Sequence, residues 1–222
     1  GQPAEILEPA LVRRLAEGTT EFLVLPLFFG PSRALTDYLP ERVAHLRAKH
    51  TSLSVRVAPP LFETHDRRLA EILADNVRAV AGGSWDQLRV ALVDHGSPAR
   101  AVTAVRDALA RQLAELLGPP AKVAACSMER RAGPAYDFNE PLLERLLAQP
   151  EWNGGRMIVA MQFLLAGRHA GAEGDVAQIC RRAETTYPNL TVQLTPLVGE
   201  HPRLTEILVD RWRAGWASAP LR

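Results

Sequence analysis

The sequence has few lysines, few cysteines and no long apolar run, and each shortage narrows what the protein can be. Only Lys49 and Lys122 are lysines, so arginine supplies nearly all of the 26 basic residues and with them forked partners for carboxylates or phosphates. Against 25 acidic residues the formal net charge is +1, which gives no reason to expect a nucleic-acid partner. No apolar run approaches the ~18 residues of a membrane span and no signal peptide is present, so we expect a cytoplasmic protein without a membrane partner.

The two cysteines and the missing motifs exclude several kinds of chemistry. Cys126 and Cys180 have no CxxC spacing, and we expect two buried free thiols rather than a disulfide or a reactive pair. There is no GxGxxG after a strand and no GxxxxGK[ST], so we expect no nucleotide cofactor. Ser97 lacks the GxSxG pattern of a hydrolase nucleophile.

A long internal duplication is the clearest sign of organisation. Residues 8–16 resemble residues 140–148, an offset of 132, and residues 53–57 resemble residues 190–194, an offset of 137. Because the matches keep the same order, they indicate one large repeated unit rather than a solenoid. We therefore expect an N-terminal unit of residues 1–84 and a C-terminal unit of residues 85–222.

The C-terminal unit alternates apolar strands with helices four times. Continuous apolar strands joined by helices predict an α/β fold in which a parallel sheet is covered on both faces, that is, a doubly wound domain. Asn139 is expected to cap one of the helices. The expected strands are 88–93, 122–128, 156–164 and 190–194, and the helices after them are 99–117, 139–148, 174–186 and 202–213.

The N-terminal unit reads as a related doubly wound unit that lacks its N-terminal strand or strands. It opens near its second helix, and two strands make a poor isolated domain. Either a leading segment of roughly 45 residues is missing from this sequence, or the exposed sheet edge is covered by a swapped element or by a second copy in a homodimer. Pro26 in the first strand suggests an edge position or a bulge. The expected strands are 22–29 and 53–58, and the expected helices are 34–50 and 67–81.

Two histidines stand where predicted strands give way to loops. His95 begins the turn His95-Gly96-Ser97 after the first strand of the C-terminal unit, and His169 lies in the glycine-rich loop after the third. The carboxyl edge of a parallel sheet is where ligands bind, and two imidazoles there can hold a divalent transition metal ion. The alternative is that each is a structural turn residue.

Acidic and basic residues flank these histidines. Glu129 also projects from a strand end, where it could complete a metal site or accept protons, or could pair with a neighbouring arginine. Arg130, Arg131 and Arg168 suit a multiply anionic substrate, although exposed arginines often only solvate a surface. Asp175 could cap the helix that it begins, and Ser97 could cap the helix after its turn.

At this point the chain resembles the class II chelatases, the sirohydrochlorin cobaltochelatase and ferrochelatase family of cobalamin and sirohaem synthesis. The motifs that carry the resemblance are His95-Gly96-Ser97 with a downstream Arg100, and the apolar strand, glycine, histidine and acidic loop of residues 163–175. Residues 24–28 and the loop 30–40 resemble the related half of the family. The resemblance covers nearly all of residues 2–213.

The resemblance implies that a divalent metal ion, Co²⁺ or Fe²⁺, is inserted as a substrate into sirohydrochlorin or a related anionic tetrapyrrole, in a cleft between the two units. It implies His95, His169 and Glu129 as metal ligands and as bases for the pyrrole protons. Ser97, Arg130, Arg131, Arg168 and Arg33 would bind the substrate, and no nucleotide is needed.

The chain also departs from the family pattern. Arg33 stands where that pattern places a histidine in the first unit, that unit has no His-Gly-Ser strand of its own, and the loop of His169 is about two residues longer. These departures favour an alternative: a non-catalytic tetrapyrrole- or metal-binding relative of the chelatases. A third alternative is an unrelated α/β protein in which both histidines are structural.

Overall fold

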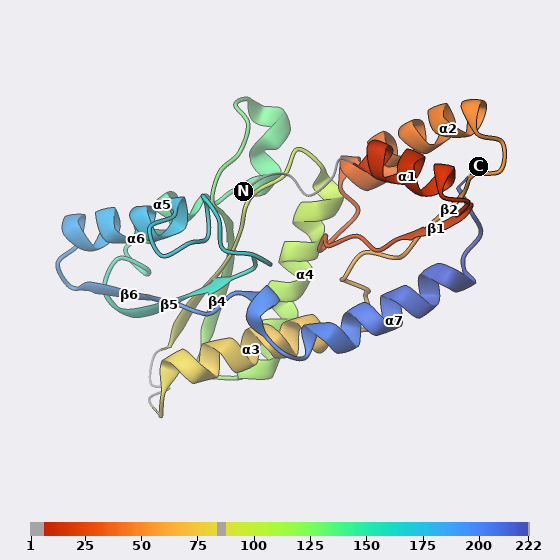
Figure 1. Cartoon of the computed structure of the whole chain (residues 1–222). Coiled ribbons are helices and arrows are strands. Elements are labelled where there is room, and N and C mark those ends of the chain that lie inside the picture. Colours follow the sequence, from red (N-terminus) through yellow and green to blue (C-terminus); the bar gives the residue numbers. More distant parts are fainter. Residues whose placement is uncertain (1–6, 84–87, 222) are drawn as a thin grey trace. The chain divides into compact units, whose positions relative to one another are not determined.

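The computed structural model describes residues 7–83 and 88–221, and contains two parallel sheets flanked by helices, as the sequence predicted (Figure 1). The chain forms two compact units, Gly1–Leu61 with Glu206–Arg222 (unit 1) and Phe62–Thr205 (unit 2). The division expected from the duplication, between residues 84 and 85, falls outside the described residues and stays a prediction about the repeat. Among the described residues, no helix is long and apolar enough to cross a membrane.

Unit 2 is built on a four-stranded sheet in the order β4-β3-β5-β6. The strands are β3 (Arg89–Asp94), β4 (Lys122–Ser127), β5 (Gly155–Met161) and β6 (Leu190–Leu194), and all pair in parallel. Residues Val90–Asp94 of the central strand β3 are all buried, which follows from helices covering both faces of the sheet.

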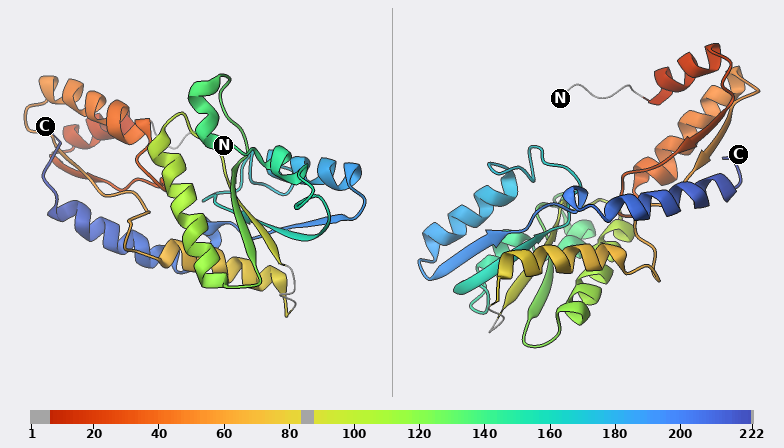
Figure 2. Two further views of the ribbon diagram at one scale, coloured as in Figure 1. Left: turned by 180° about the vertical axis from the view of Figure 1, so that it is seen from behind. Right: turned by 60° about the horizontal axis from the view of Figure 1, so that its bottom comes forward.

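The helices of unit 2 form one layer on each side of this sheet (Figures 1 and 2). On one side α3 (Arg68–Ala81) and α4 (Arg100–Leu117) pack against each other and against β3, β4 and β5. On the other side α5 (Leu143–Leu147) and α6 (Asp175–Thr186) cover a core that includes Cys126 and Cys180. Both cysteines are free and buried, which confirms that expectation.

Unit 1 contains the parallel pair β1 (Glu21–Val24) and β2 (Ser54–Val57). The helices α1 (Leu7–Ala16) and α2 (Leu39–Lys49) contribute Leu11, Val43 and Leu46 to the core beside these strands. The end of α7 (Leu204–Ala217) also lies against them, because a Cβ built on Gly215 would sit 2.6 Å from Leu23 Cδ1.

The last helix of each sequence repeat belongs to the unit built mainly from the other repeat. Helix α3 ends the first repeat but is part of unit 2, whereas α7 ends the second repeat and is part of unit 1 from Glu206 onward. The duplication therefore gives the order of the elements correctly, but not the compact unit in which each final helix packs.

Three element predictions were wrong in detail. The first strand was expected to run to residue 29, but β1 ends at Val24, two residues before Pro26, which has no N–H to donate to a ladder. The helix expected over 34–50 begins as a π-helical turn, η1 (Ala34–Tyr38), before α2. The helix expected from Asn139 begins only at Leu143, after the 3₁₀ segment η2 (Pro134–Asn139).

Candidate functional site

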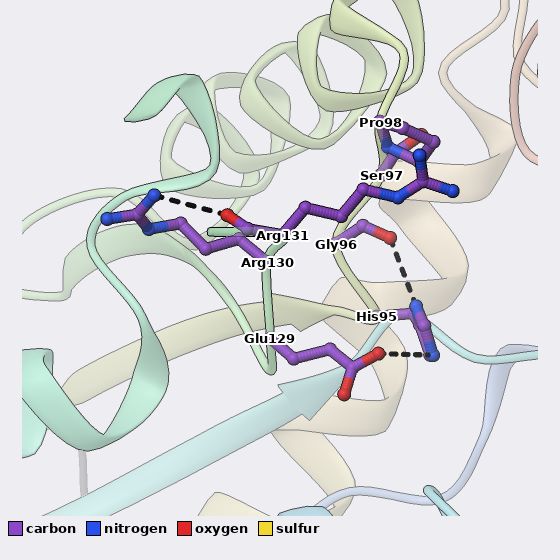
Figure 3. A pocket seen from close by; sticks show the side chains of 7 residues that line it. All are labelled: His95, Gly96, Ser97, Pro98, Glu129, Arg130 and Arg131. Carbon is purple, nitrogen blue, oxygen red and sulfur yellow. Dashed lines mark hydrogen bonds and ion pairs between the residues drawn. The ribbon is translucent and has the colours of Figure 1, made fainter. Parts of the chain in front are cut away.

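The ends of β3 and β4 place His95 beside Glu129. The two strands run in register to Asp94 and Ser127, and the backbone pairing continues with Met128 N–H donating to Asp94 O at 2.7 Å and Glu129 N–H donating to His95 O at 3.2 Å. Both side chains are exposed, and His95 Nε2 lies 3.4 Å from Glu129 Oε1 (Figure 3). The adjacent strand ends therefore bring an imidazole and a carboxylate together without any help from loop folding.

His169 reaches the same place from the loop after β5, the other neighbour of β3. Its ring meets the His95 ring edge to face, with the ring centroids 4.7 Å apart and the planes at 77°. The structure thus brings the two sequence-predicted histidines into contact, because the strand order β4-β3-β5 puts their three strand ends side by side.

A hydrogen bond at Nδ1 fixes the tautomer and the orientation of each imidazole. His95 Nδ1 lies 3.0 Å from Gly96 O, and His169 Nδ1 lies 2.6 Å from Asp175 Oδ2. A carbonyl and an ionised carboxylate only accept hydrogen bonds, so Nδ1 carries the hydrogen in both rings. The lone pair of each neutral ring is then on Nε2, the atom that a metal ion would use. Asp175 was expected to cap α6, but it binds His169 instead, and Gly174 stands at the cap.

The predicted three-ligand set is not assembled as a closed site. Within residues 7–83 and 88–221, no group of three or more His, Cys, Asp or Glu side chains is arranged to hold a metal ion. What the structure places together is the pair of histidines, with Glu129 next to His95. Such an arrangement leaves coordination positions open, which is the property that separates reactive metal sites from structural ones.

A hollow of about 320 Å³ opens beside His95 and Glu129. Arg130 and Arg131 both line it but extend in opposite directions, with Arg131 reaching toward Ser97 and Pro98 (Figure 3). Ser97 could have capped α4, which begins at Arg100. Its Oγ instead accepts a hydrogen bond from Ala99 N–H at 3.1 Å, and Ala99 is the residue just before the helix.

The predicted substrate-binding arginines differ in how their charges are used. The Arg130 guanidinium is bound by Glu140 at 2.6 Å and Asp137 at 3.1 Å, so its charge is already neutralised within the protein. Arg131 is exposed and rests over the Tyr136 ring, and Arg168 is 85% exposed in the His169 loop. Arg33 is exposed at the start of η1 in unit 1, so its part in this site stays a prediction.

A buried polar network under the His95 turn was missed by the sequence analysis. It joins four buried side chains: Asp94, Arg106, Ser127 and Asn139. Burial raises the pKa of the Asp94 carboxyl, while the hydrogen bond from Ser127 and the charge of Arg106 act in the opposite direction. One signal was present in the sequence, because Arg106 falls on the apolar stripe of its helix, between Val102 and Leu109.

A sequence model of the CbiX family matches residues 89–214, more than half of the chain, and this segment contains His95, Glu129 and His169. The chain belongs to the CbiX family. The resemblance to class II chelatases, predicted from the motifs, is thereby confirmed. A search of curated protein sequences found no match.

Solved structures of the same fold align along almost the whole CbiX-family chain. SirB from Bacillus subtilis with Fe³⁺ has 16% sequence identity and a TM-score of 0.76, covering 100% of this chain and 83% of that chain. The sirohydrochlorin chelatase SirB from Bacillus subtilis subspecies spizizenii in complex with cobalt has 17% identity and a TM-score of 0.72, covering 100% and 82%. CbiX, the terminal enzyme for biosynthesis of siroheme in denitrifying bacteria, has 18% identity and a TM-score of 0.60, covering 94% and 80%. At these identities the similarity establishes the fold.

Proposed function

We propose that this protein inserts a divalent metal ion, Co²⁺ or Fe²⁺, into sirohydrochlorin or a related anionic tetrapyrrole. The observation that carries the proposal is the contact between His95 and His169, whose Nε2 lone pairs are left available by the hydrogen bonds on Nδ1. Membership of the CbiX family supports it, as do the structural relatives described as a sirohydrochlorin chelatase and as SirB with Fe³⁺.

The spacing of His95 and Glu129 suits a shared cation. With the hydrogen of His95 on Nδ1, its Nε2 lone pair faces the Glu129 carboxylate at 3.4 Å, and two negative ends oppose each other unless a positive charge lies near both. Two donors bound at ~2.0–2.2 Å to one tetrahedral ion lie ~3.4 Å apart. A divalent ion would therefore fit between these two atoms with little rearrangement.

Transfer requires that the protein hold the ion by few bonds. Two imidazoles and one carboxylate leave positions free for the nitrogens of the macrocycle, which can replace the protein ligands one at a time. Insertion also displaces two N–H protons from the ring, so a base must be close to the metal. Once they no longer bind the metal, the Glu129 carboxylate and the adjacent His95 imidazole can each accept one of the two protons.

The surroundings suit a substrate that carries carboxylates. Arg131 and Arg168 hold exposed guanidinium groups near the histidines, and a guanidinium binds a carboxylate through two parallel hydrogen bonds. Arg130 also lines the hollow, where its ion pairs with Glu140 and Asp137 hold it in place.

The test is metal insertion into sirohydrochlorin, followed by the change in the visible spectrum of the tetrapyrrole, with Co²⁺ and Fe²⁺ tried separately. We expect His95→Ala and His169→Ala each to lower the rate at least ~100-fold, because each removes a ligand and the open site has few to spare. His65→Ala, at an exposed histidine outside the hollow, is the matched control and should insert metal at the wild-type rate.

Undiminished insertion by both variants would overturn the proposal. If the wild-type protein binds sirohydrochlorin without producing the metallated spectrum, the alternative of a non-catalytic tetrapyrrole-binding relative is favoured instead. Turnover of several equivalents of tetrapyrrole per protein excludes that alternative.

A further inference from the structure

The buried side-chain amide of Asn139 is hydrogen-bonded to the turn that carries His95. Asn139 Oδ1 accepts a hydrogen bond from Ser97 N–H at 2.9 Å, and Asn139 Nδ2 donates to Ser97 O at 3.0 Å. The amide thus binds both backbone groups of Ser97, in the way that a neighbouring strand would. Asn139 is fully buried and lies 42 residues from Ser97 in the sequence, so these hydrogen bonds form only in the folded protein.

The remaining bonds of Asn139 hold the amide itself in place. Thr103 Oγ1 donates to Asn139 Oδ1 at 3.2 Å, and Asn139 Nδ2 also donates to Tyr136 O at 3.1 Å. Its backbone carbonyl accepts from the buried Arg106 guanidinium at 3.0 Å. With both donors and the acceptor satisfied, the side chain has one favourable orientation, and that orientation points its amide at Ser97.

The other side of the turn is tied to β4 by a second group of bonds. Asp94 Oδ1 accepts from Gly96 N–H at 3.1 Å and from Ser127 Oγ at 2.6 Å, and Arg106 donates to Ser127 Oγ at 2.6 Å. Gly96 has φ +90°, and a Cβ built on it would lie 1.9 Å from Glu129 O, so the turn lies directly against the backbone of Glu129. Any displacement of the turn changes the distance between His95 and Glu129.

We infer that Asn139 is a positioning residue, which holds the His95-Gly96-Ser97 turn so that the His95 imidazole faces Glu129 and His169. The inference deepens the proposed function, and its consequence for metal binding rests on that function. Asn139 contacts neither the hollow nor the imidazole, so it acts through the backbone of Ser97.

The first measurement needs no metal. Hydrogen–deuterium exchange of the amides of Gly96 and Ser97 is compared in the wild-type protein and in Asn139→Ala, after far-UV circular dichroism has verified the fold of each. We expect exchange of the Ser97 amide to accelerate at least ~10-fold, because its acceptor is gone. Asn139→Leu is the second variant if Asn139→Ala does not fold, since it keeps much of the side-chain volume and also removes the acceptor of the Ser97 N–H.

The second measurement is the affinity for Co²⁺ alone, from its visible absorption. We expect Asn139→Ala to weaken binding about 10–100-fold, the usual effect of removing a group that orients a metal ligand. Asn76→Ala is the matched control, because Asn76 is also a buried asparagine whose Nδ2 donates to a backbone carbonyl, that of Pro196, but it makes no bond to the turn or to Asn139. It should bind Co²⁺ within about twofold of wild type.

A merely structural effect is separated by repeating Asn139→Ala in a His95→Ala background. If Asn139 acts through His95, the second substitution changes the remaining Co²⁺ affinity by less than about twofold. An equal loss in both backgrounds, or an unchanged Ser97 exchange rate in a folded Asn139 variant, overturns the inference. A wild-type protein that binds no Co²⁺ overturns the proposed function instead, while the exchange rates still decide whether Asn139 holds the turn.

Discussion

His169 Nδ1 lies 2.6 Å from Asp175 Oδ2, and this bond fixes a histidine of a glycine-rich loop to the first residue of a helix. The loop folds back on itself at both ends of the bond, since Asp175 N–H donates to Arg168 O and Val176 N–H donates to His169 O, each at 3.1 Å. The carboxylate therefore gives the His169 ring a fixed tautomer and a fixed direction, although its loop is rich in glycine.

Replacing this carboxylate should weaken metal binding without removing a ligand. We expect Asp175→Asn to lower the Co²⁺ affinity about 10–100-fold, because an amide accepts the Nδ1 hydrogen less strongly and can itself donate, which favours the wrong tautomer. The measurement is a Co²⁺ titration followed by visible absorption.

Glu173→Gln provides the matched control for Asp175→Asn. Glu173 belongs to the same loop and also changes from carboxylate to amide, but its partner is Arg181 rather than a histidine. It should bind Co²⁺ as the wild-type protein does. Equal losses in the two variants would mean that the loop's overall charge matters, and not the bond to His169.

Of the two adjacent arginines of the hollow, Arg131 should matter for substrate binding and Arg130 for the stability of the protein. Arg131→Ala removes an exposed guanidinium, and we expect KM for sirohydrochlorin to rise about 3–10-fold with kcat and the melting temperature nearly unchanged. Arg130→Ala leaves Glu140 and Asp137 without their common partner, so it should lower the melting temperature measurably. Steady-state kinetics and thermal unfolding of both variants check this, and a similar KM change in both would contradict it.

The strand ends of the site could be predicted from the sequence because they follow from local pattern alone. Apolar runs mark β3, β4 and β5, and whatever follows a parallel strand lies at one edge of the sheet. His95, Glu129 and His169 were placed by that rule, and the structure brings them together. Helix α4 was likewise predicted from its apolar stripe, and it begins within one residue of the expected start.

The polar contacts that could not be predicted from the sequence join residues that are far apart along the chain. Asn139 was read as a helix cap because Asn favours that position, but its amide is used by Ser97 instead. Arg130 was predicted to bind the substrate because it flanks the candidate metal ligands, and its ion pair with Glu140 could not be foreseen because it forms only through the tertiary fold. Propensity describes a residue with its neighbours, whereas the choice of a buried polar partner is made by the tertiary fold.

A side chain at Gly96 should lower the free energy of unfolding. It has φ +90°, and a Cβ there would lie 1.9 Å from Glu129 O. Gly118 has φ +64° with open space around it, so Gly118→Ala reports the conformational cost alone, about 1–2 kcal/mol. We expect Gly96→Ala to lower the free energy of unfolding by about 1–3 kcal/mol more, since the turn and Glu129 must move apart. Urea unfolding of both variants measures the difference, and equal losses would show that the close approach is not tight.

Glu140 should contribute to stability in a pH-dependent way. Although burial raises the pKa of its carboxyl, the bond from Leu142 N–H and the interactions with Arg130 and Arg145 outweigh burial, and the pKa is lowered from 4.5. The folded state therefore binds this proton less readily than the unfolded state, so the contribution is present in full above pH 4.5 and is lost as pH falls through the lowered value.

Unfolding free energies of wild type and Glu140→Gln, measured from pH 7 to pH 3, test this relationship. We expect the variant to be less stable by about 1 kcal/mol at pH 7, a modest value because solvent partly screens these ion pairs. The difference should shrink as pH falls from 4.5 through the lowered pKa, since the carboxyl of the folded protein is then protonated and loses its ion pair with Arg130. Glu144→Gln, at an exposed position of α5, is the control and should follow wild type at every pH. A Glu140→Gln difference that stays constant down to pH 3 would show that packing around Glu140, rather than its charge, accounts for its contribution to stability.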